Sequence, residues 1–330
     1  MNLGSVWDVP GRKRLFDVKK HVPEDMCFSP DGKFLAVVGN YAAFHVYDDK
    51  GKEYWNLTLG GHGDTIVSHV EFTPDSRLMV ASSKNGMLRV WDVKKKKPVA
   101  LFCFPSPLEH DQAVQDGYLR AARALAGKGK NPDGVEAFVV FKTAIEYFGN
   151  FTLSPDGKTV AVPLQNSDVL LIELASGKIL KTLTTKQKHA FSVRYSADGK
   201  MLAIGGGGEF DDDGWLGTIE LWDVAKGKRV RSWKAHRHTV LHMAFSPDGK
   251  ILASGGTVDC VRVWDAATGK PMYRLHEKIE GTSDARCLGV AFLPDGKALL
   301  TLPVVRLGDN SPVHFWEPAT GKRLPQPLAR

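Results

Sequence analysis

The densest group of reactive side chains in this sequence lies in a glycine-rich segment, residues 205–217. Its acidic residues are Glu209, Asp211, Asp212 and Asp213, and its aromatic residues are Phe210 and Trp215. Clustered carboxylates can bind calcium, but this segment lacks the spaced ligands and the closing glutamate of a known calcium loop. Aromatic side chains beside acidic ones suit a protein or peptide interface, because aromatic anchors often dominate binding energy. We expect flexible glycines to present them to a partner. The alternative is a solvated hairpin whose aromatic rings fold back onto the rim.

Other candidate chemistry is weaker. His236, His238 and His242 could suggest a metal, but they read as loop and rim histidines at the entry to a strand. Lys94–Lys97 could touch nucleic acid or an anionic membrane, yet no aromatic residues interleave the lysines, so a solvated turn is favoured. Gly127–Lys130 lacks the phosphate-loop pattern. No Ser/His/Asp or Cys/His triad follows from a motif. We therefore predict no catalytic residues, no cofactor and no metal.

The elements that position these residues come from an internal repeat. Ser-Pro-Asp-Gly or a near copy recurs, and a Trp-Asp-like position follows each copy, at the same interval in four units and at a longer interval in the other two. The longer intervals run from Gly199 to Trp222 and from Gly296 to Trp316. A period of about 40 residues indicates one supersecondary unit that is copied and stacked. The copies are Ser29–Gly32, Thr73–Ser76, Ser154–Gly157, Ser196–Gly199, Ser246–Gly249 and Leu293–Gly296.

Within a unit, the pattern predicts four antiparallel strands. In Val240–Asp265, apolar residues flank the turn on both sides, and alternation leads into Trp264. The Pro-Asp-Gly sequence predicts a tight hairpin, and a second turn with glycine and lysine follows most of the Trp-Asp-like pairs. Sheets of four strands bury both faces only when copies are arranged radially.

This pattern resembles the WD40 β-propeller family, in particular its bacterial members, over nearly the whole chain. The resemblance implies structural roles for a hydrogen-bonded set of His, Ser or Thr, Asp and Trp in each unit. The matching positions are His62, Trp91, Trp222, His236, Ser254, Trp264 and Trp316. The set is incomplete, since Val258 stands at one Asp position and Ala81 at one Ser position. It also implies a scaffold role rather than an enzyme, by analogy of fold.

The number of blades depends on residues 105–148. The interval from Trp91 to Gly157 is more than twice as long as the equivalent interval from Trp222 to Gly249. The surplus is almost one repeat, so the segment is either a degenerate blade or an insertion. Residues 113–126 favour a short helix, but Gly117, Asp133-Gly134 and an apolar run favour a blade. We predict an all-β fold, a single propeller of seven four-stranded blades over residues 1–330.

The two ends of the chain predict how the propeller closes. Val6-Trp7-Asp8 and a turn precede a strand at the N-terminus, and the last unit ends in a proline-containing segment that makes a poor strand. We therefore expect Arg14–Val18 to supply the outer strand of the final blade.

Composition limits the compartment and the kinds of partner that we expect. The chain has 330 residues, with 44 Lys and Arg against 37 Asp and Glu, for a formal net charge of +7. Its four cysteines form no CxxC pair, which favours reduced thiols in the cytoplasm. No apolar run is long enough for a membrane span. We expect a cytoplasmic monomer that binds neither membranes nor nucleic acid.

The connections between strands predict where a partner binds. The Pro-Asp-Gly turns and the Gly-Lys turns hardly vary, and they lie at one end of each blade, here called the turn side. The second-to-third strand and blade-to-blade connections lie at the other end, the loop side. They carry the extra length, in Gly205–Gly217, in Pro303–Pro312 with Arg306, and in residues 105–135. Length variation on one side of a repeat array indicates a binding surface. The alternative is small-ligand binding or hydrolysis at the central channel.

Overall fold

The structure is a computed structural model, and its regular elements are all β-strands in the residues that it describes. These residues are 4–8, 13–18, 23–39, 43–58, 67–83, 87–103, 136–139, 150–164, 167–207, 209–211, 214–257, 261–275, 286–304 and 313–325. The all-β prediction agrees with this. Contacts between Cα atoms divide the chain into two compact units. The first consists of Met1–Val160, Leu171–Leu180 and Arg330, and the second consists of Ala161–Leu170 and Lys181–Ala329. One domain over 1–330 stays a prediction.

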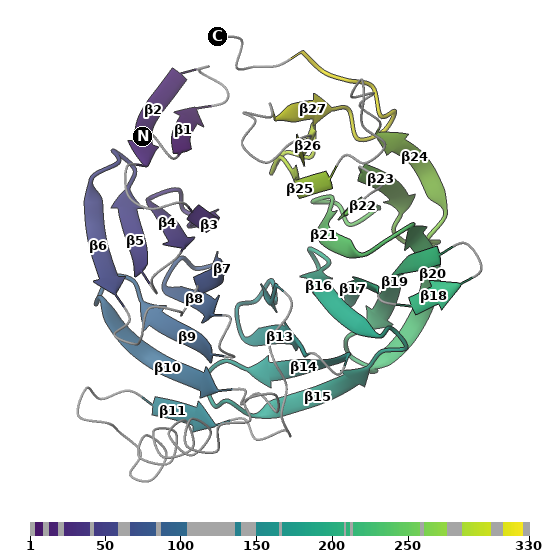
Figure 1. Cartoon of the computed structure of the whole chain (residues 1–330). Helices are drawn as coiled ribbons and strands as arrows, with labels where there is room; N and C mark the ends of the chain where they lie inside the picture. The colour runs from purple at the N-terminus through teal and green to yellow at the C-terminus, as the bar shows by residue number, and fades with distance from the viewer. Residues whose placement is uncertain are drawn as a thin grey trace. The chain divides into compact units, whose positions relative to one another are not determined.

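In the first unit, a two-stranded hairpin precedes two sheets that we call blades 1 and 2 (Figure 1). The hairpin consists of β1 (Gly4–Asp8) and β2 (Lys13–Val18). Blade 1 consists of β3 (Pro23–Phe28), β4 (Phe34–Gly39), β5 (Ala43–Asp48) and β6 (Glu53–Thr58). Blade 2 consists of β7 (Val67–Phe72), β8 (Leu78–Ser83), β9 (Met87–Asp92), β10 (Lys97–Cys103) and β11 (Glu136–Val139).

Blade 3 has strands in both units, and blades 4 to 6 lie in the second unit. Blade 3 consists of β12 (Thr152–Leu153), β13 (Thr159–Pro163), β14 (Asp168–Glu173) and β15 (Ile179–Thr184). Blade 4 consists of β16 (His189–Tyr195), β17 (Met201–Gly207), β18 (Glu209–Asp211), β19 (Gly214–Asp223) and β20 (Lys228–His236). Blade 5 consists of β21 (Val240–Phe245), β22 (Ile251–Gly256), β23 (Val261–Asp265) and β24 (Pro271–Leu275). Blade 6 consists of β25 (Arg286–Phe292), β26 (Leu299–Val304) and β27 (His314–Trp316).

The prediction of seven blades is wrong, because the described strands form six blades of the β-propeller type. Residues 105–148 contribute one described strand, β11, which pairs in parallel with β10 at the edge of blade 2, from Ala100↔Glu136 to Cys103↔Val139. An added edge strand satisfies backbone groups that would otherwise be exposed, and it needs no hairpins or core of its own. Length alone could not distinguish this insertion from a blade. The helix predicted at 113–126 lies outside the described residues.

The prediction that Arg14–Val18 completes the last blade is also wrong. β2 pairs with β1 along its length, from Gly4↔Val18 to Asp8↔Lys13, and the described strands of blade 6 are β25, β26 and β27 only. Val6 and Val18 of the hairpin are buried against Leu35, Val37 and Tyr47 of blade 1. Pairing close in sequence needs little loop closure, and burial on blade 1 holds the hairpin in place.

The Pro-Asp-Gly turns are tight hairpins with a shared hydrogen-bond pattern. The Ser29 hydroxyl donates to Asp31 (2.8 Å) and accepts from the Phe34 amide (2.9 Å), while Gly32 takes φ 70°. The Ser29 hydrogen bond lowers the pKa of Asp31 to about 2. The same serine-to-aspartate bond recurs in the turns of blades 3, 4 and 5. The turns of blades 1, 3, 4 and 5 are therefore each held by their own side chains.

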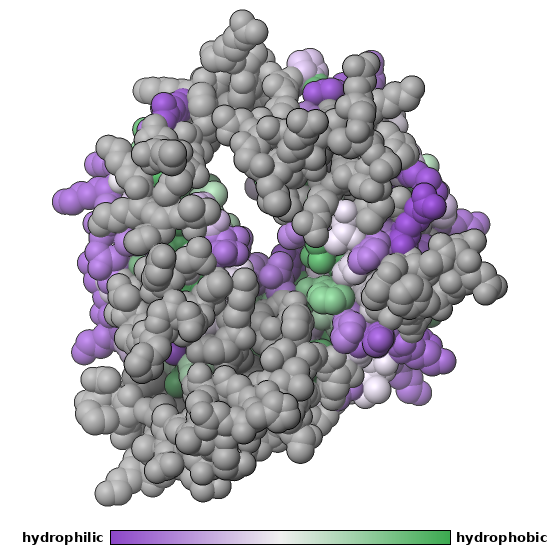
Figure 2. All heavy atoms as spheres, viewed as in Figure 1, coloured by the Kyte–Doolittle hydropathy of each residue, from purple (hydrophilic) through white to green (hydrophobic). Residues whose placement is uncertain are grey.

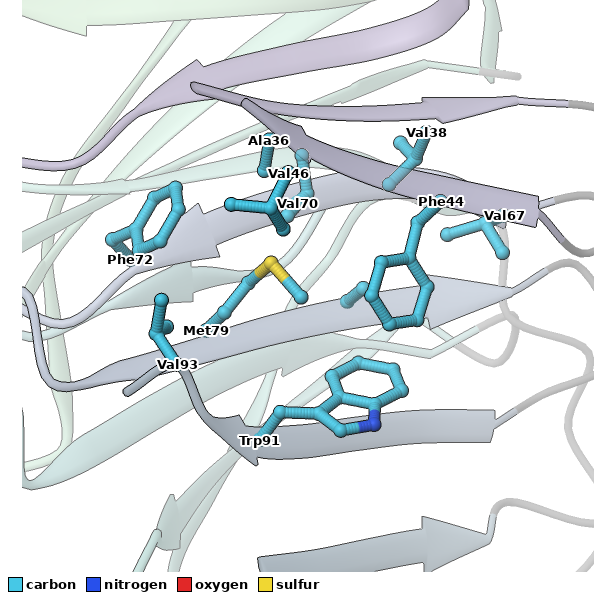
Figure 3. Packing of buried hydrophobic residues seen from close by; sticks show 11 residues of the cluster. Ala36, Val38, Phe44, Val46, Val67, Val70, Phe72, Met79, Trp91 and Val93 are labelled. Carbon is cyan, nitrogen blue, oxygen red and sulfur yellow. The ribbon is translucent and has the colours of Figure 1, made fainter. Parts of the chain in front are cut away.

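The faces of neighbouring blades pack through apolar side chains. Between blades 1 and 2, the rings of Phe44 and Trp91 pack in a tilted arrangement with centroids 4.7 Å apart, and Met79 lies beside Val70 (Figure 3). Equivalent clusters join blade 4 to blade 5 and blade 5 to blade 6. Since a four-stranded sheet leaves two apolar faces, this packing is what stabilises each blade.

One buried hydrogen-bond network contains His236, Ser254 and Trp264, the residues that match the hydrogen-bonded set of the WD40 family. Ser254 Oγ lies 2.8 Å from His236 Nε2 and accepts a 2.8 Å hydrogen bond from Trp264 Nε1. His236 ends β20 of blade 4, and the other two belong to blade 5, so the network links two blades. Val258, at the Asp position of this set, lies outside the described residues.

We expect the change Ser254→Ala to destabilise the protein by about 1–3 kcal/mol for each buried group that loses its partner. The Trp264 N–H donates to this hydroxyl in a fully buried site, so water cannot replace it. Urea unfolding followed by circular dichroism measures the change. Ser232→Ala, at an exposed position on β20, is the control and should stay within about 0.5 kcal/mol of the unmodified protein. Equal effects of the two changes would contradict the role of the network.

Candidate functional site

The residues predicted to bind a partner lie mostly in strands rather than in a loop. Glu209, Phe210 and Asp211 form β18, and Trp215 belongs to β19. In the backbone register Phe210 pairs with Trp215, and Glu209 pairs with Leu216. The side chains of these four predicted residues, and the whole of Asp212, Asp213 and Arg306, lie outside what the structure describes. The segment is therefore a hairpin that extends blade 4 on its loop side.

The glycines at the base of this hairpin are required by close packing, not by flexibility. Gly205 and Gly206 are buried at the end of β17. A Cβ at Gly206 would lie 1.7 Å from Gln187 Oε1, and one at Gly217 would lie 1.8 Å from the His238 carbonyl oxygen. Neither approach is sterically possible. The interpretation of these residues as flexible was wrong, because a glycine run has the same sequence whether it moves or packs.

The structure also describes cavities on the turn side, which the sequence did not predict. They lie at three blade junctions and measure about 490 Å³ between blades 2 and 3, about 400 Å³ between blades 4 and 5, and about 610 Å³ between blades 5 and 6. Each is bordered by a Pro-Asp-Gly-type turn and by the turn that follows a Trp-Asp-like pair. Repetition of two similar turns leaves a similar gap at these three junctions, so the regular turn pattern was the sequence signal that could have predicted them.

The cavity between blades 2 and 3 differs in charge from the cavity between blades 4 and 5. Between blades 2 and 3 the lining includes three basic side chains, Arg77, Lys95 and Lys158, against Asp92 and Glu173. Between blades 4 and 5 the charged lining residues are the aspartates of the two turns, Asp198 and Asp248. The two cavities therefore lie at similar positions beside the turns but differ in the charge of their linings. The outer strands carry their own basic residues, and Figure 2 shows mainly hydrophilic residues on the right of the view, where β20 and β24 lie.

Another titratable cluster lies on the first strands of blades 1 and 2, and a buried histidine is at its centre. His69 on β7 lies with Nδ1 2.6 Å from Asp25 Oδ2 and with Nε2 3.2 Å from Glu71 Oε1. Asp25 also accepts the Val70 amide (3.0 Å), and Glu71 accepts the Leu153 amide (2.8 Å). The cluster therefore ties β3 to β7 and β7 to β12.

The cluster is a charged brace rather than a proton-transfer site. Burial by itself lowers the pKa of His69, but the hydrogen bonds to Asp25 and Glu71 outweigh burial and raise it. Burial likewise favours the neutral form of Asp25, yet the His69 hydrogen bond and charge hold its pKa below the ordinary value. Because both ring nitrogens face carboxylates, the imidazolium has no lone pair with which to accept a substrate proton.

The Trp residues of the repeat are anchored by different partners. Trp222 Nε1 donates to Glu220 Oε2 (2.9 Å), and Trp316 Nε1 donates to Thr301 Oγ1 (2.9 Å). Glu220 is buried and also pairs with Arg229 at 2.9 Å. Trp91 is buried between blades 1 and 2, and His62 lies outside the described residues. Glu220 is a partner that sequence reasoning missed, since the family pattern has Ser or Thr for this role.

Comparison with protein families decides the identity of the repeat. The model of the WD domain, G-beta repeat, matches residues 55–92 and 227–265. The chain carries WD40 repeats. Each matched repeat begins in or next to the outer strand of one blade, β6 or β20, and ends at the Trp-Asp pair of the next blade. A WD40 sequence repeat is therefore offset by one strand from the blade.

Several known proteins are similar to the chain at low identity. The Serine-threonine kinase receptor-associated proteins of Bos taurus and Homo sapiens are 23% and 22% identical over 234 residues, covering 69% of this chain and 63% of theirs. An uncharacterized WD repeat-containing protein of Synechocystis is 26% identical over 204 residues, 62% of this chain and 53% of its own. The chain thus matches less than two thirds of the length of these relatives.

Two further observations concern the described residues alone. None of them forms a helix of the length and apolar character needed to cross a bilayer. No three or more of their His, Cys, Asp and Glu side chains are grouped so as to hold a metal ion. Of the three histidines considered in the sequence, His236 lies in the Ser254 network, and His238 Nδ1 accepts the Thr239 amide (2.9 Å).

Proposed function

We propose that this protein is a non-catalytic scaffold that binds another protein or a peptide through the loop side of its blades. WD40 repeats and relatives named as receptor-associated proteins support an interaction role. The observation that carries the choice of the loop side is the β18–β19 hairpin. The β17–β19 pairing ends at Gly205↔Ile219, and β19 continues to Gly214 with β18 as its partner.

The hairpin has two properties that a docking element needs. Its base is rigid, because the packed glycines at 206 and 217 leave no room for a side chain. Its paired strands bring Phe210 opposite Trp215, and a pair of large aromatic residues provides anchoring area at low entropic cost. Arg306 belongs to a second long connection of the loop side. A cytoplasmic location and a monomeric state are parts of this proposal.

The test replaces residues 208–216 with Asn-Gly, a dipeptide that suits a two-residue hairpin turn. Because β17 and β19 keep their own pairing, the shortened protein should fold with a thermal midpoint close to that of the unmodified one. We expect it to lose at least one partner that co-purifies from cell extract with the intact protein. The milder variant Phe210→Ser with Trp215→Ser should lose the same partner.

The matched control is Leu180→Ser, which removes an exposed apolar side chain from the outer strand β15. It should recover the full set of partners. If the shortened protein, the aromatic double variant and the control all recover the same partners, the loop side is not the binding surface.

A further inference from the structure

We infer that the cavity between blades 2 and 3, on the turn side, is a second docking site that takes an apolar side chain of an acidic peptide. We call it the blade 2–3 notch. It does not depend on the function proposed above, since none of its lining residues belongs to the β18–β19 hairpin. It is lined by Leu78, Val90, Val99, Ala100, Leu174 and Ala175, together with charged residues at its rim.

The floor of the notch is apolar and held by the fold. Val90, Ala100 and Leu174 are buried, and Leu78 and Val99 are half-buried. The turns of the two blades meet directly, because a Cβ on Gly157 would lie 2.9 Å from the Pro74 ring. A volume of about 490 Å³ exceeds what one leucine or phenylalanine side chain occupies, so an anchor can enter without rearrangement.

The rim of the notch is basic. Lys95 and Arg77 are 75% and 63% exposed, and their contacts with Asp92 and Asp75 are both 3.6 Å, typical of weak surface pairs. Lys94 and Lys97 belong to the same run as Lys95 and are also exposed, and Lys158 borders the notch from blade 3. Basic side chains therefore outnumber acidic ones, which favours an acidic partner.

The lysine run is fixed at its centre. Lys96 takes a left-handed φ of 54°, lies 3.9 Å from the centre of the Tyr54 ring and donates to the Tyr54 carbonyl oxygen (2.7 Å). This anchoring keeps the neighbouring lysines beside the notch. Less conformational entropy is therefore lost when a partner binds.

The same features favour a peptide over nucleic acid. Phosphate binding does not need an apolar floor, so the apolar lining of the notch would contribute little to a complex with a nucleic-acid backbone. A peptide with leucines between acidic residues can place one leucine in the floor and direct its carboxylates to the lysines.

The test uses fluorescence anisotropy with a labelled peptide in which two leucines alternate with aspartates and glutamates. We expect binding that weakens about tenfold or more when serines replace the leucines, because an apolar anchor of this size is removed. Lys95→Glu combined with Lys158→Glu should weaken it to a similar degree, since both side chains are exposed and the fold does not depend on them.

A matched pair of variants separates the notch from general charge attraction. Ala175 and Ala267 occupy the same position in the turns of blades 3 and 5, and both are exposed. Ala175→Phe fills the blade 2–3 notch and should weaken binding about tenfold. Ala267→Phe fills the acidic cavity between blades 4 and 5 and should leave binding unchanged.

Three results would overturn the inference: absence of binding, equal loss with Ala175→Phe and Ala267→Phe, or tighter binding of an oligothymidine strand than of the peptide. The last would assign the site to nucleic acid. Thermal melting checks that each variant is folded. Since the shortened β18–β19 protein should bind the acidic peptide normally, failure of the loop-side proposal and failure of this one are distinguishable.

Discussion

Replacing Trp91 with alanine is expected to lower the free energy of unfolding by about 3–5 kcal/mol. The Trp91 side chain is 1% exposed and lies between blades 1 and 2, with its ring centroid 4.7 Å from Phe44 and 6.4 Å from Trp55. Its removal leaves a cavity that the strands on either side cannot close, because their backbone pairing is fixed. Urea unfolding followed by circular dichroism measures the loss without relying on tryptophan fluorescence.

Two further variants test this explanation. Phe44→Ala should destabilise the protein by a similar amount, and the double variant should lose less than the sum, since the two rings share one contact. Leu15→Ala, at a side chain that is 50% exposed on β2, should change the free energy of unfolding by no more than about 0.5 kcal/mol. A loss below about 1.5 kcal/mol for Trp91→Ala would show that packing between blades 1 and 2 is not a main source of stability.

The brace around His69 gives the second large effect. Changing His69 to glutamine is expected to cost about 3 kcal/mol near pH 6, because it leaves the carboxylates of Asp25 and Glu71 without their cationic partner. This is the lower end of the range for a broken buried ion pair, since Asp25 and Glu71 keep 29% and 19% exposure.

The same cluster predicts a pH dependence with a definite sign. The folded-state pKa of His69 is raised above 6.5, so its contribution is complete below pH 6.5 and is lost as the pH rises through the folded pKa. The folded-state pKa of Asp25 is lowered below 3.8, so its contribution is present above pH 3.8 and is lost as the pH falls through the folded pKa. The brace is strongest between these limits.

Urea titrations from pH 5 to pH 9 test this dependence. The difference in stability between the unmodified protein and His69→Gln should shrink as the pH rises. His189→Gln, at a half-buried histidine of β16, is the matched control and should leave the pH profile in place. A difference that stays constant from pH 5 to pH 9 would refute the charged state of His69.

The repeat pattern predicted the strands and turns well, for a local reason. Ser29 and Asp31 bond to each other and to the turn backbone, so the residues that define the turn also build it. The alternation in β23 likewise predicts a strand buried on its apolar positions. Such elements depend on neighbours within a few residues, which a sequence displays directly.

The candidate sites were predicted less well, because they depend on residues far apart in the chain. The sequence did not single out His69, because its partner Asp25 and the Leu153 amide that bonds to Glu71 come close only through the packing of three blades. The blade 2–3 notch exists because the turns at Arg77 and Gly157 meet across a junction. Neither arrangement has a local pattern.

The amino-acid sequence by itself determined the repeat, its turns and the β-strand character, since each follows from backbone conformations that nearby residues set. Tertiary structure decided that residues 136–139 add an edge strand to blade 2 rather than a seventh blade, that β2 pairs with β1, and that the glycines before Glu209 are packed. These outcomes depend on which distant surface gives greater burial and better backbone pairing. They are decided by the free energies of complete alternative folds, which no short stretch of the sequence determines.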